Sequence, residues 1–201
     1  KIKNILKKKL LSNPRTAREL FDNDFDEFYN YIFSEECYYP HAPRHTTYKQ
    51  RLQEGKNILL IGHRESIKTQ LAVAYVIWCI CAKKKHFIIR SAFNKLDAET
   101  RIYDIRNVFE ENEKIKRIYG KLLHDSELDK GKYKKTANIK QIHFRNGAFL
   151  KASSLTTSTR GWNHKINNIT HRPDLYVGDD VDTNESVANE NIIEKNYLRL
   201  R

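Results

Sequence analysis

Apolar side chains recur at helical spacing near the start of the chain. In residues 15–37 they alternate with acidic residues, and this period predicts one or two amphipathic helices that pack on another surface. Pro40 and Pro43 interrupt the pattern and predict a linker. We therefore expect an N-terminal helical segment at residues 1–44 and a main domain at residues 45–201. The apolar positions are Leu20, Phe21, Phe25, Phe28, Tyr29 and Ile32.

The pattern then changes to strands that alternate with helices. Residues 58–61 form a short apolar run that predicts a strand, and residues 68–82 are apolar on nearly all sides and predict a buried helix. Residues 87–89 predict a second strand, and residues 95–119 predict a long helix. This alternation is typical of an α/β domain with a largely parallel sheet. The buried stripe expected on the long helix is Leu96, Ile102, Ile105, Val108 and Phe109.

The second half of the chain predicts a hairpin and a final strand. Residues 139–144 and 148–152 are apolar runs on either side of Asn146 and Gly147. Asn-Gly is the preferred pair for a two-residue hairpin turn, because both positions tolerate a positive φ. Residues 175–177 predict a last short strand.

The charge of the chain favours a polyanionic partner. Lys and Arg number 37 against 25 Asp and Glu, which gives a formal charge of +12 and a pI near 9.5. Cationic side chains neutralise phosphates and release counterions, although lysine-rich proteins are also common in AT-rich genomes. Residues 174–194 instead hold seven carboxylates and no Lys or Arg. That excess predicts metal or acid/base chemistry, with a solvated acidic loop as the alternative.

Length and cysteine use narrow the class of protein. The 201 residues fit one domain with a small extension. Because the chain starts at Lys1 and contains no methionine, we expect it to be part of a longer protein. Cys37, Cys79 and Cys81 lack zinc-ligand spacing and are expected to be buried thiols in a reducing compartment. The most apolar stretch, residues 71–82, is too short to span a bilayer, so we expect a soluble, intracellular protein.

A phosphate-binding loop is predicted between the first strand and the buried helix. The spacing G-x-x-x-x-G-K-[ST] is met except at Ile67, where glycine is expected. In such a loop the helix N-terminus faces the phosphates, Lys68 contacts the β- and γ-phosphates, and the Thr69 hydroxyl coordinates Mg²⁺. The alternative is an ordinary strand-to-helix turn that contains Lys and Thr. The loop residues are Gly62, His63, Arg64, Glu65, Ser66, Ile67, Lys68 and Thr69.

Two carboxylates at the end of the last predicted strand complement this loop. Asp179 and Asp180 directly follow the apolar run at residues 175–177 and one glycine. In this arrangement the first carboxylate holds the water shell of Mg²⁺ and the second polarises the attacking water. The loop and the carboxylates together predict Mg²⁺-dependent hydrolysis of ATP.

These motifs resemble those of the ATPase half of phage terminase large subunits. The likeness covers residues 45–201. It implies a three-layer P-loop NTPase fold of the ASCE/RecA-like type, with a largely parallel sheet and a small N-terminal helical segment. The matching segments are Tyr48-Lys49-Gln50, the phosphate loop with its early arginine, Thr159-Arg160-Gly161-Trp162, and Arg172-Pro173-Asp174 leading to Asp179, Asp180, Asp182 and Glu185.

The resemblance implies roles for residues at the site. Arg64 would stabilise charge on the transferred phosphoryl group, Asp179 would be the metal carboxylate and Asp180 the catalytic carboxylate. Tyr48 and Gln50 would read the adenine, with surface helix residues as the alternative.

Four further residues are candidates for contact with nucleotide or nucleic acid. Arg160 would sense nucleotide or contact DNA, and its alternative is a structural turn. The basic stretches suit contact with a DNA backbone, which is independent of sequence and sensitive to salt. The best patch is Lys132, Lys134 and Lys135, and its alternative is a solvated lysine-rich loop.

The implied function is a motor that hydrolyses ATP with Mg²⁺ to move double-stranded DNA into a procapsid. It would act in the host-cell cytoplasm, in a homo-oligomeric ring with a portal and a small terminase subunit and without a membrane. The nuclease domain of the family would lie outside this chain. One alternative is another nucleic-acid-stimulated P-loop ATPase such as a helicase. The other is a DNA-binding or assembly module whose nucleotide site has decayed at Ile67.

Overall fold

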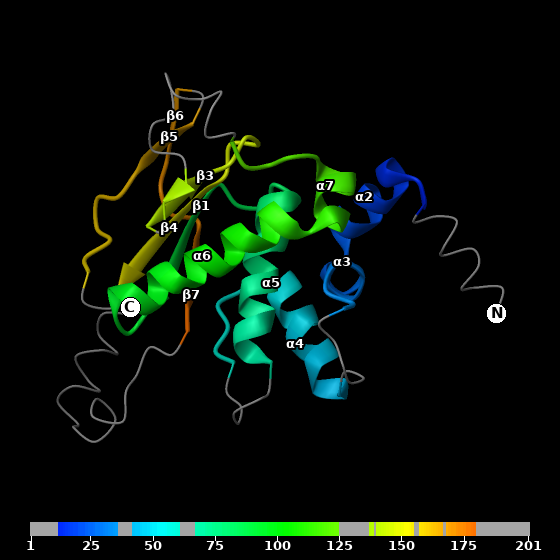
Figure 1. Ribbon diagram of the computed structural model, residues 1–201. Coiled ribbons are helices and arrows are strands. Elements are labelled where there is room, and N and C mark those ends of the chain that lie inside the picture. The colour runs from blue at the N-terminus through cyan, green and yellow to red at the C-terminus, as the bar shows by residue number, and fades with distance from the viewer. Residues whose placement is uncertain are drawn as a thin grey trace. The chain divides into compact units, whose positions relative to one another are not determined.

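The computed structural model describes residues 12–35, 42–60, 67–124, 137–138, 140–154, 157–166 and 168–179. The chain forms two compact units, and Figure 1 labels most of their elements. Unit one comprises Lys1–Lys84 and Phe109–Leu122, and unit two comprises Lys85–Val108 and Leu123–Arg201. The expected boundary between residues 44 and 45 falls inside a helix of unit one and stays a prediction.

Unit one is helical in its described part. Two capped helices, α2 (Pro14–Asn23) and α3 (Phe25–Ile32), confirm the helices predicted within residues 15–37. Asn13 Oδ1 accepts from the amide of Arg15 at 2.9 Å, and Asp24 Oδ1 accepts from the amide of Glu27 at 3.0 Å. Such caps satisfy amides that have no partner inside the helix. The other helices are α4 (Pro43–Gln53), α5 (Lys68–Cys81) and α7 (Glu113–Tyr119).

Aromatic rings from α2, α3 and α5 form the core of unit one. The Phe25 ring lies 5.5 Å from the Tyr75 ring and 5.3 Å from the Trp78 ring, between centroids. The indole N–H of Trp78 donates to the carbonyl of Phe21 at 2.7 Å. Helix α5 buries nearly all its sides from Leu71 onward, so the buried helix predicted at residues 68–82 is confirmed.

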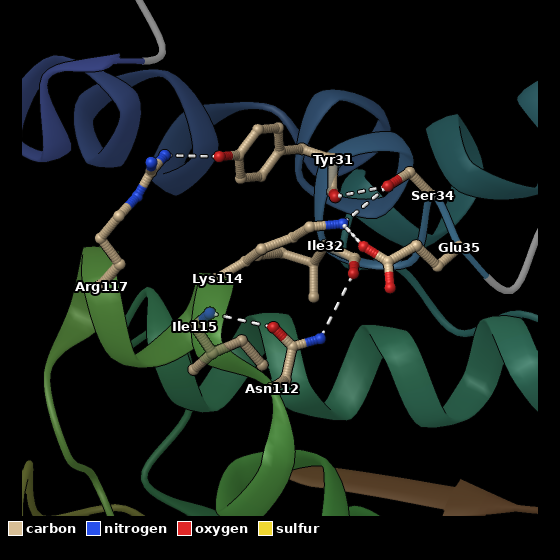
Figure 2. A network of polar contacts seen from close by, with 8 residues as sticks. All are labelled: Tyr31, Ile32, Ser34, Glu35, Asn112, Lys114, Ile115 and Arg117. Carbon is tan, nitrogen blue, oxygen red and sulfur yellow. Dashed lines mark hydrogen bonds and ion pairs between the residues drawn. The ribbon is translucent and has the colours of Figure 1, made fainter.

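The single helix predicted at residues 95–119 is wrong, because the structure has two helices, α6 (Lys95–Glu111) and α7. Asn112 separates them: its side chain accepts from the amide of Ile115 at 3.1 Å and so caps α7. Asn112 also donates to Ile32 at 3.3 Å. Figure 2 shows how α7 is fastened to α3 and the residues after it, through Asn112 with Ile32, Lys114 with Ser34 and Glu35, and Arg117 with Tyr31.

Leu96 does not belong to the buried stripe of α6. Ala98, Ile102 and Ile105 are buried, whereas Leu96 is 69% exposed. At about 100° per residue, Leu96 points to the side of the helix opposite these three residues. Phe109 is buried as predicted, and Val108 is only half-buried.

A mixed five-stranded sheet defines unit two as α/β. The strand order is β2-β3-β4-β1-β7, with β1 parallel to β4 and β7, and β3 antiparallel to β4 and β2. The P-loop NTPase fold stays a prediction. The strands are β1 (Phe87–Ala92), β2 (Ala137–Asn138), β3 (Gln141–His143), β4 (Phe149–Ser154) and β7 (Leu175–Gly178).

The predicted hairpin is confirmed as β3 and β4. Ile142 pairs with Leu150 across the two strands. Gly147 has φ 93° in the turn, and Asn146 Oδ1 accepts from the amide of Ala148 at 3.1 Å. The two-residue Asn-Gly turn itself is wrong: Phe144 pairs with Ala148 across the three residues 145–147, and Gly147 is the one of these with a positive φ.

The strand predicted at residues 58–61 is wrong for its described part, residues 58–60. These residues have no strand conformation and pair with no described strand. Leu59 is 83% exposed and Ile58 36% exposed. An apolar run becomes a buried strand only where neighbours cover it, and nothing in the described residues covers Leu59.

Two of the three cysteines are buried, as predicted. Cys79 and Cys81 are buried thiols on α5, and burial raises the pKa of Cys81. Cys37 lies outside the described residues. None of the helices in the described ranges has the length and apolar content needed to cross a membrane.

Candidate functional site

The predicted site residues divide between the described and undescribed parts of the chain. In unit one the structure describes Ile67, Lys68, Thr69, Tyr48 and Gln50, and in unit two it describes Asp179 and Arg160. Outside the described residues lie Gly62, His63, Arg64, Glu65, Ser66, Asp180, Lys132, Lys134 and Lys135, as well as Asp182 and Glu185.

The start of α5 has an unusual backbone. Ile67 is left-handed, with φ 53° and ψ 14°, and its carbonyl accepts from the amide of Leu71 at 2.8 Å. A positive φ is rare for a β-branched residue and costs about 1–3 kcal/mol. Glycine adopts this conformation without that cost, and glycine is what the phosphate-loop pattern expects here. Position 67 therefore combines a glycine-like backbone with an isoleucine side chain, next to Lys68 and Thr69 in the first turn.

Tyr48 and Gln50 lie on α4, on either side of a buried lysine. Lys49 is 1% exposed, forms an ion pair with Asp26, donates to Asn30 at 3.3 Å and lies 5.0 Å from the Tyr29 ring centroid. These contacts fasten α4 to α3. They leave Gln50 exposed and Tyr48 half-buried, so the adenine-reading role stays a prediction.

Asp179 directly follows β7, as the sequence predicts, and pairs with a buried arginine. Arg90, on β1, is 0% exposed; its Nη2 lies 2.7 Å from Asp179 Oδ2, and its Nη1 donates to the Val177 carbonyl at 3.3 Å. The Asp179 amide donates to the Ser91 carbonyl at 3.1 Å. Arg90 was not among the predicted site residues, and its signal in the sequence is a single charge directly after the apolar run of residues 87–89.

Hydroxyl groups also lie at the carboxyl ends of the parallel strands β1 and β4. Ser91 is buried, and its Oγ has no hydrogen-bond partner among the described residues. Ser154 Oγ and Thr157 Oγ1 lie 2.8 Å apart. Open α/β sheets bind ligands at the carboxyl edge of their strands. The hydroxyl groups at this edge could donate hydrogen bonds to a phosphate group, and the Asp179 carboxylate is an oxygen ligand that suits a hard metal ion.

One carboxylate is compatible with Mg²⁺ at this edge. Mg²⁺ usually takes one or two carboxylates and completes its shell with waters and phosphate oxygens. Asp179 could supply that carboxylate while Arg90 holds its Oδ2. The described residues contain no group of three or more His, Cys, Asp or Glu side chains placed to hold a metal, so waters and phosphates would supply the other ligands.

Asp174 has a structural role at the other end of β7. Its Oδ1 accepts from the amide of Phe87 at 3.0 Å, and its Oδ2 accepts from the amide of His86 at 2.8 Å. Its own amide donates to the Phe87 carbonyl at 2.9 Å. These bonds join the start of β7 to the start of β1, at the end of the strands opposite Asp179.

Arg160 lies in a turn. The amide of Trp162 donates to the carbonyl of Thr159 at 3.2 Å, and Gly161 has φ 77°. The structural turn is therefore present, Arg160 is exposed, and its nucleotide or DNA contact stays a prediction. Beside the turn, Lys151 Nζ lies 3.6 Å from the centroid of the Trp162 ring.

Comparison with protein-family models, curated proteins and solved structures found no match to this chain.

Proposed function

We propose that this chain is the ATP-hydrolysing motor domain of a terminase-like DNA translocase. The backbone at Ile67 carries the proposal. A residue held at φ 53° immediately before Lys68 and Thr69, at the glycine position of the loop pattern, is strained. Strain of this kind persists where the surrounding structure requires it, often at ligand sites.

Each residue would have a distinct task. Lys68 would bind the β- and γ-phosphates, and Thr69 and Asp179 would hold Mg²⁺. When bound, Mg²⁺ supplies positive charge to the phosphoryl oxygens. Arg90 would act as a positioning residue, because it holds Asp179 through Oδ2. Asp180 would accept a proton from the attacking water, and Arg64 would stabilise charge on the phosphoryl group.

Charge supports double-stranded DNA as the substrate of the motor. The chain carries a formal charge of +12, which favours backbone contact with a polyanion. In the full assembly the motor would work as a ring of identical subunits with a portal and a small terminase subunit, filling a procapsid in the host cytoplasm.

The test is Mg²⁺-dependent ATP binding and hydrolysis by this chain, with and without duplex DNA. We expect Lys68→Ala to abolish both. Lys56→Ala is the matched control, since Lys56 is an exposed lysine of the same unit, and it should keep both. No binding of Mg²⁺-ATP by the unmodified chain would refute the proposal, as would equal loss in the two variants.

The side chain of Ile67 favours a second candidate, a DNA-binding or assembly module with a decayed nucleotide site. A β-branched residue limits the approach of phosphate to the backbone. DNA binding by a chain that binds no nucleotide would support this candidate.

A further inference from the structure

Unit two carries a two-stranded ribbon outside its main sheet. Strands β5 (His164–Ile166) and β6 (Ile169–His171) lie side by side (Figure 1) and pair antiparallel. His164 lies opposite His171 in this pairing. Asn168 has φ 65° in the connecting turn. This ribbon was not predicted, although the sequence Asn167-Asn168 between two isoleucines is a hairpin signal.

One face of the ribbon packs on the sheet. His164 stacks on the Phe149 ring at 4.0 Å, and His171 stacks on the His86 ring at 4.7 Å, between centroids. Ile166 packs near Gly147, where an added Cβ would lie 3.2 Å from Ile166 Cγ2. These contacts fix the ribbon beside the first residues of β1 and β4.

The opposite face of the ribbon is exposed and basic. Lys165 and Thr170 form a cross-strand pair, and Arg172 lies two residues after Thr170, on the same side by the alternation of a strand. All three are exposed, whereas His164, Ile166 and His171 are half-buried. The sequence places no Asp or Glu at any position from residue 130 to residue 173. The outer face therefore offers cations and hydrogen-bond donors, and the segment that builds the ribbon has no carboxylate to repel a phosphate.

We propose that the β5–β6 ribbon enters the major groove of duplex DNA, with Lys165 and Arg172 on the phosphates that border the groove. This rests on the proposed function, because it takes DNA as the substrate, and it adds the contact surface. The major groove of B-DNA admits a two-stranded ribbon, whereas the major groove of duplex RNA is too narrow. The cations of the outer face, Lys165 and Arg172, therefore carry the contact, since Ile169 pairs with Ile166 on the side of the ribbon that faces the sheet.

The ribbon and Asp179 lie at opposite ends of β1. His171 contacts His86, directly before β1, whereas the amide of Asp179 bonds to Ser91 near the end of β1. DNA on the ribbon therefore leaves the carboxyl edge of the sheet open to nucleotide. DNA binding and ATP hydrolysis can be measured separately for this reason.

The test measures binding of a labelled DNA duplex by fluorescence anisotropy, without nucleotide, over a range of salt concentrations. The ribbon variant is Lys165→Gln with Arg172→Gln. The matched control is Arg44→Gln with Lys56→Gln, which removes the same charge from exposed positions of unit one. Circular dichroism checks that both variants keep their secondary structure.

We expect the ribbon variant to bind DNA about 10-fold more weakly or worse, and its plot of log affinity against log salt to be shallower by about 1.8, or roughly 0.9 for each lost phosphate contact. The control should change affinity by less than about 3-fold. Equal losses in the two variants, or an unchanged ribbon variant, would overturn the proposal. Duplex RNA bound as tightly as DNA, with the same dependence on the ribbon, would overturn groove entry.

The same preparations separate this inference from the motor. If the chain binds DNA through the ribbon but does not hydrolyse ATP, the ribbon proposal holds and the motor proposal is wrong. If ATP hydrolysis depends on Lys68 but DNA binding does not change in the ribbon variant, the motor proposal holds and the ribbon proposal is wrong.

Discussion

The two units hold their elements together by different means. Unit one packs rings such as Phe25 and Trp78 from separate helices into an apolar core. Unit two joins β7 to β1 with a carboxylate at each end, Asp174 at the start and Asp179 at the finish. Apolar burial has little directional preference, whereas hydrogen bonds and ion pairs require defined geometry. Asp174 and Asp179, which match a functional motif in the sequence, therefore also set the register of β7 against β1.

The largest effect is expected at the ion pair of unit two. Asp179→Ala leaves Arg90 buried without its carboxylate, and loss of one member of a buried pair costs about 3–5 kcal/mol of unfolding free energy. Urea unfolding followed by circular dichroism measures this cost. The control is Asp104→Ala, since the Asp104 side chain is 43% exposed and pairs with Arg101 at 3.2 Å; a pair so open to solvent contributes about 0–1 kcal/mol. Similar costs at the two sites would contradict a structural role for Asp179.

A smaller loss is expected in the aromatic core of unit one. Phe25→Leu keeps an apolar side chain but removes ring contacts with Tyr75 and Trp78. At about 0.5–1.5 kcal/mol for each aromatic pair, the loss should be about 2 kcal/mol in the same urea experiment. Tyr103→Leu is the control, because Tyr103 is 48% exposed and should change stability by less than about 0.5 kcal/mol. Equal effects would mean that the rings do not stabilise unit one.

A gain is expected at the two ends of α5. Ile67→Gly should relieve left-handed strain and raise stability by about 1 kcal/mol, after the backbone entropy of glycine is subtracted. Lys83→Gly is a matched control, since Lys83 also has a positive φ, of 52°, and should give a similar gain. Isothermal titration with Mg²⁺-ATP should then show tighter binding for Ile67→Gly alone. Tighter Mg²⁺-ATP binding in both variants would contradict the proposal that Ile67 belongs to a phosphate-binding loop.

The smallest effect is expected from pH, at the ribbon. Burial, and then the neighbouring His171, lower the pKa of His164 from its ordinary 6.5. The unfolded chain therefore binds this proton more readily than the folded chain, so stability should fall as the pH drops from 6.5 toward the folded pKa. Thermal unfolding between pH 7.5 and 5.5 measures the slope, and His164→Phe should reduce it. An unchanged slope in that variant would assign the dependence to other groups.

Local patterns in the sequence predicted much of the fold. Helical spacing identified α2, α3 and α5, and the Asn146-Gly147 pair identified the β3–β4 hairpin. The break at Asn112 was missed because the apolar period continues across it, while the cap depends on one side chain. The exposure of Leu59 depends on which segments cover it, and a short apolar run carries no such information.

The candidate site was predictable only in part. The position of Asp179 just beyond β7 followed from the end of an apolar run. Its partner Arg90 lies 89 positions away along the chain, and parallel pairing of β1 with β7 brings the two together. Pairing between distant strands leaves no periodic signal. The same holds for Asp174, whose bonds to the amides of His86 and Phe87 come from that pairing.

The chain contains two tryptophans, and each unit has one of them. Trp78 is 4% exposed and bonded to a carbonyl, whereas Trp162 is half-buried beneath the ammonium group of Lys151. These surroundings differ in polarity and in local charge, so the two indoles should emit at different wavelengths. Replacing either with phenylalanine leaves one optical reporter, and stopped-flow mixing could then time the folding of each unit separately without any added dye.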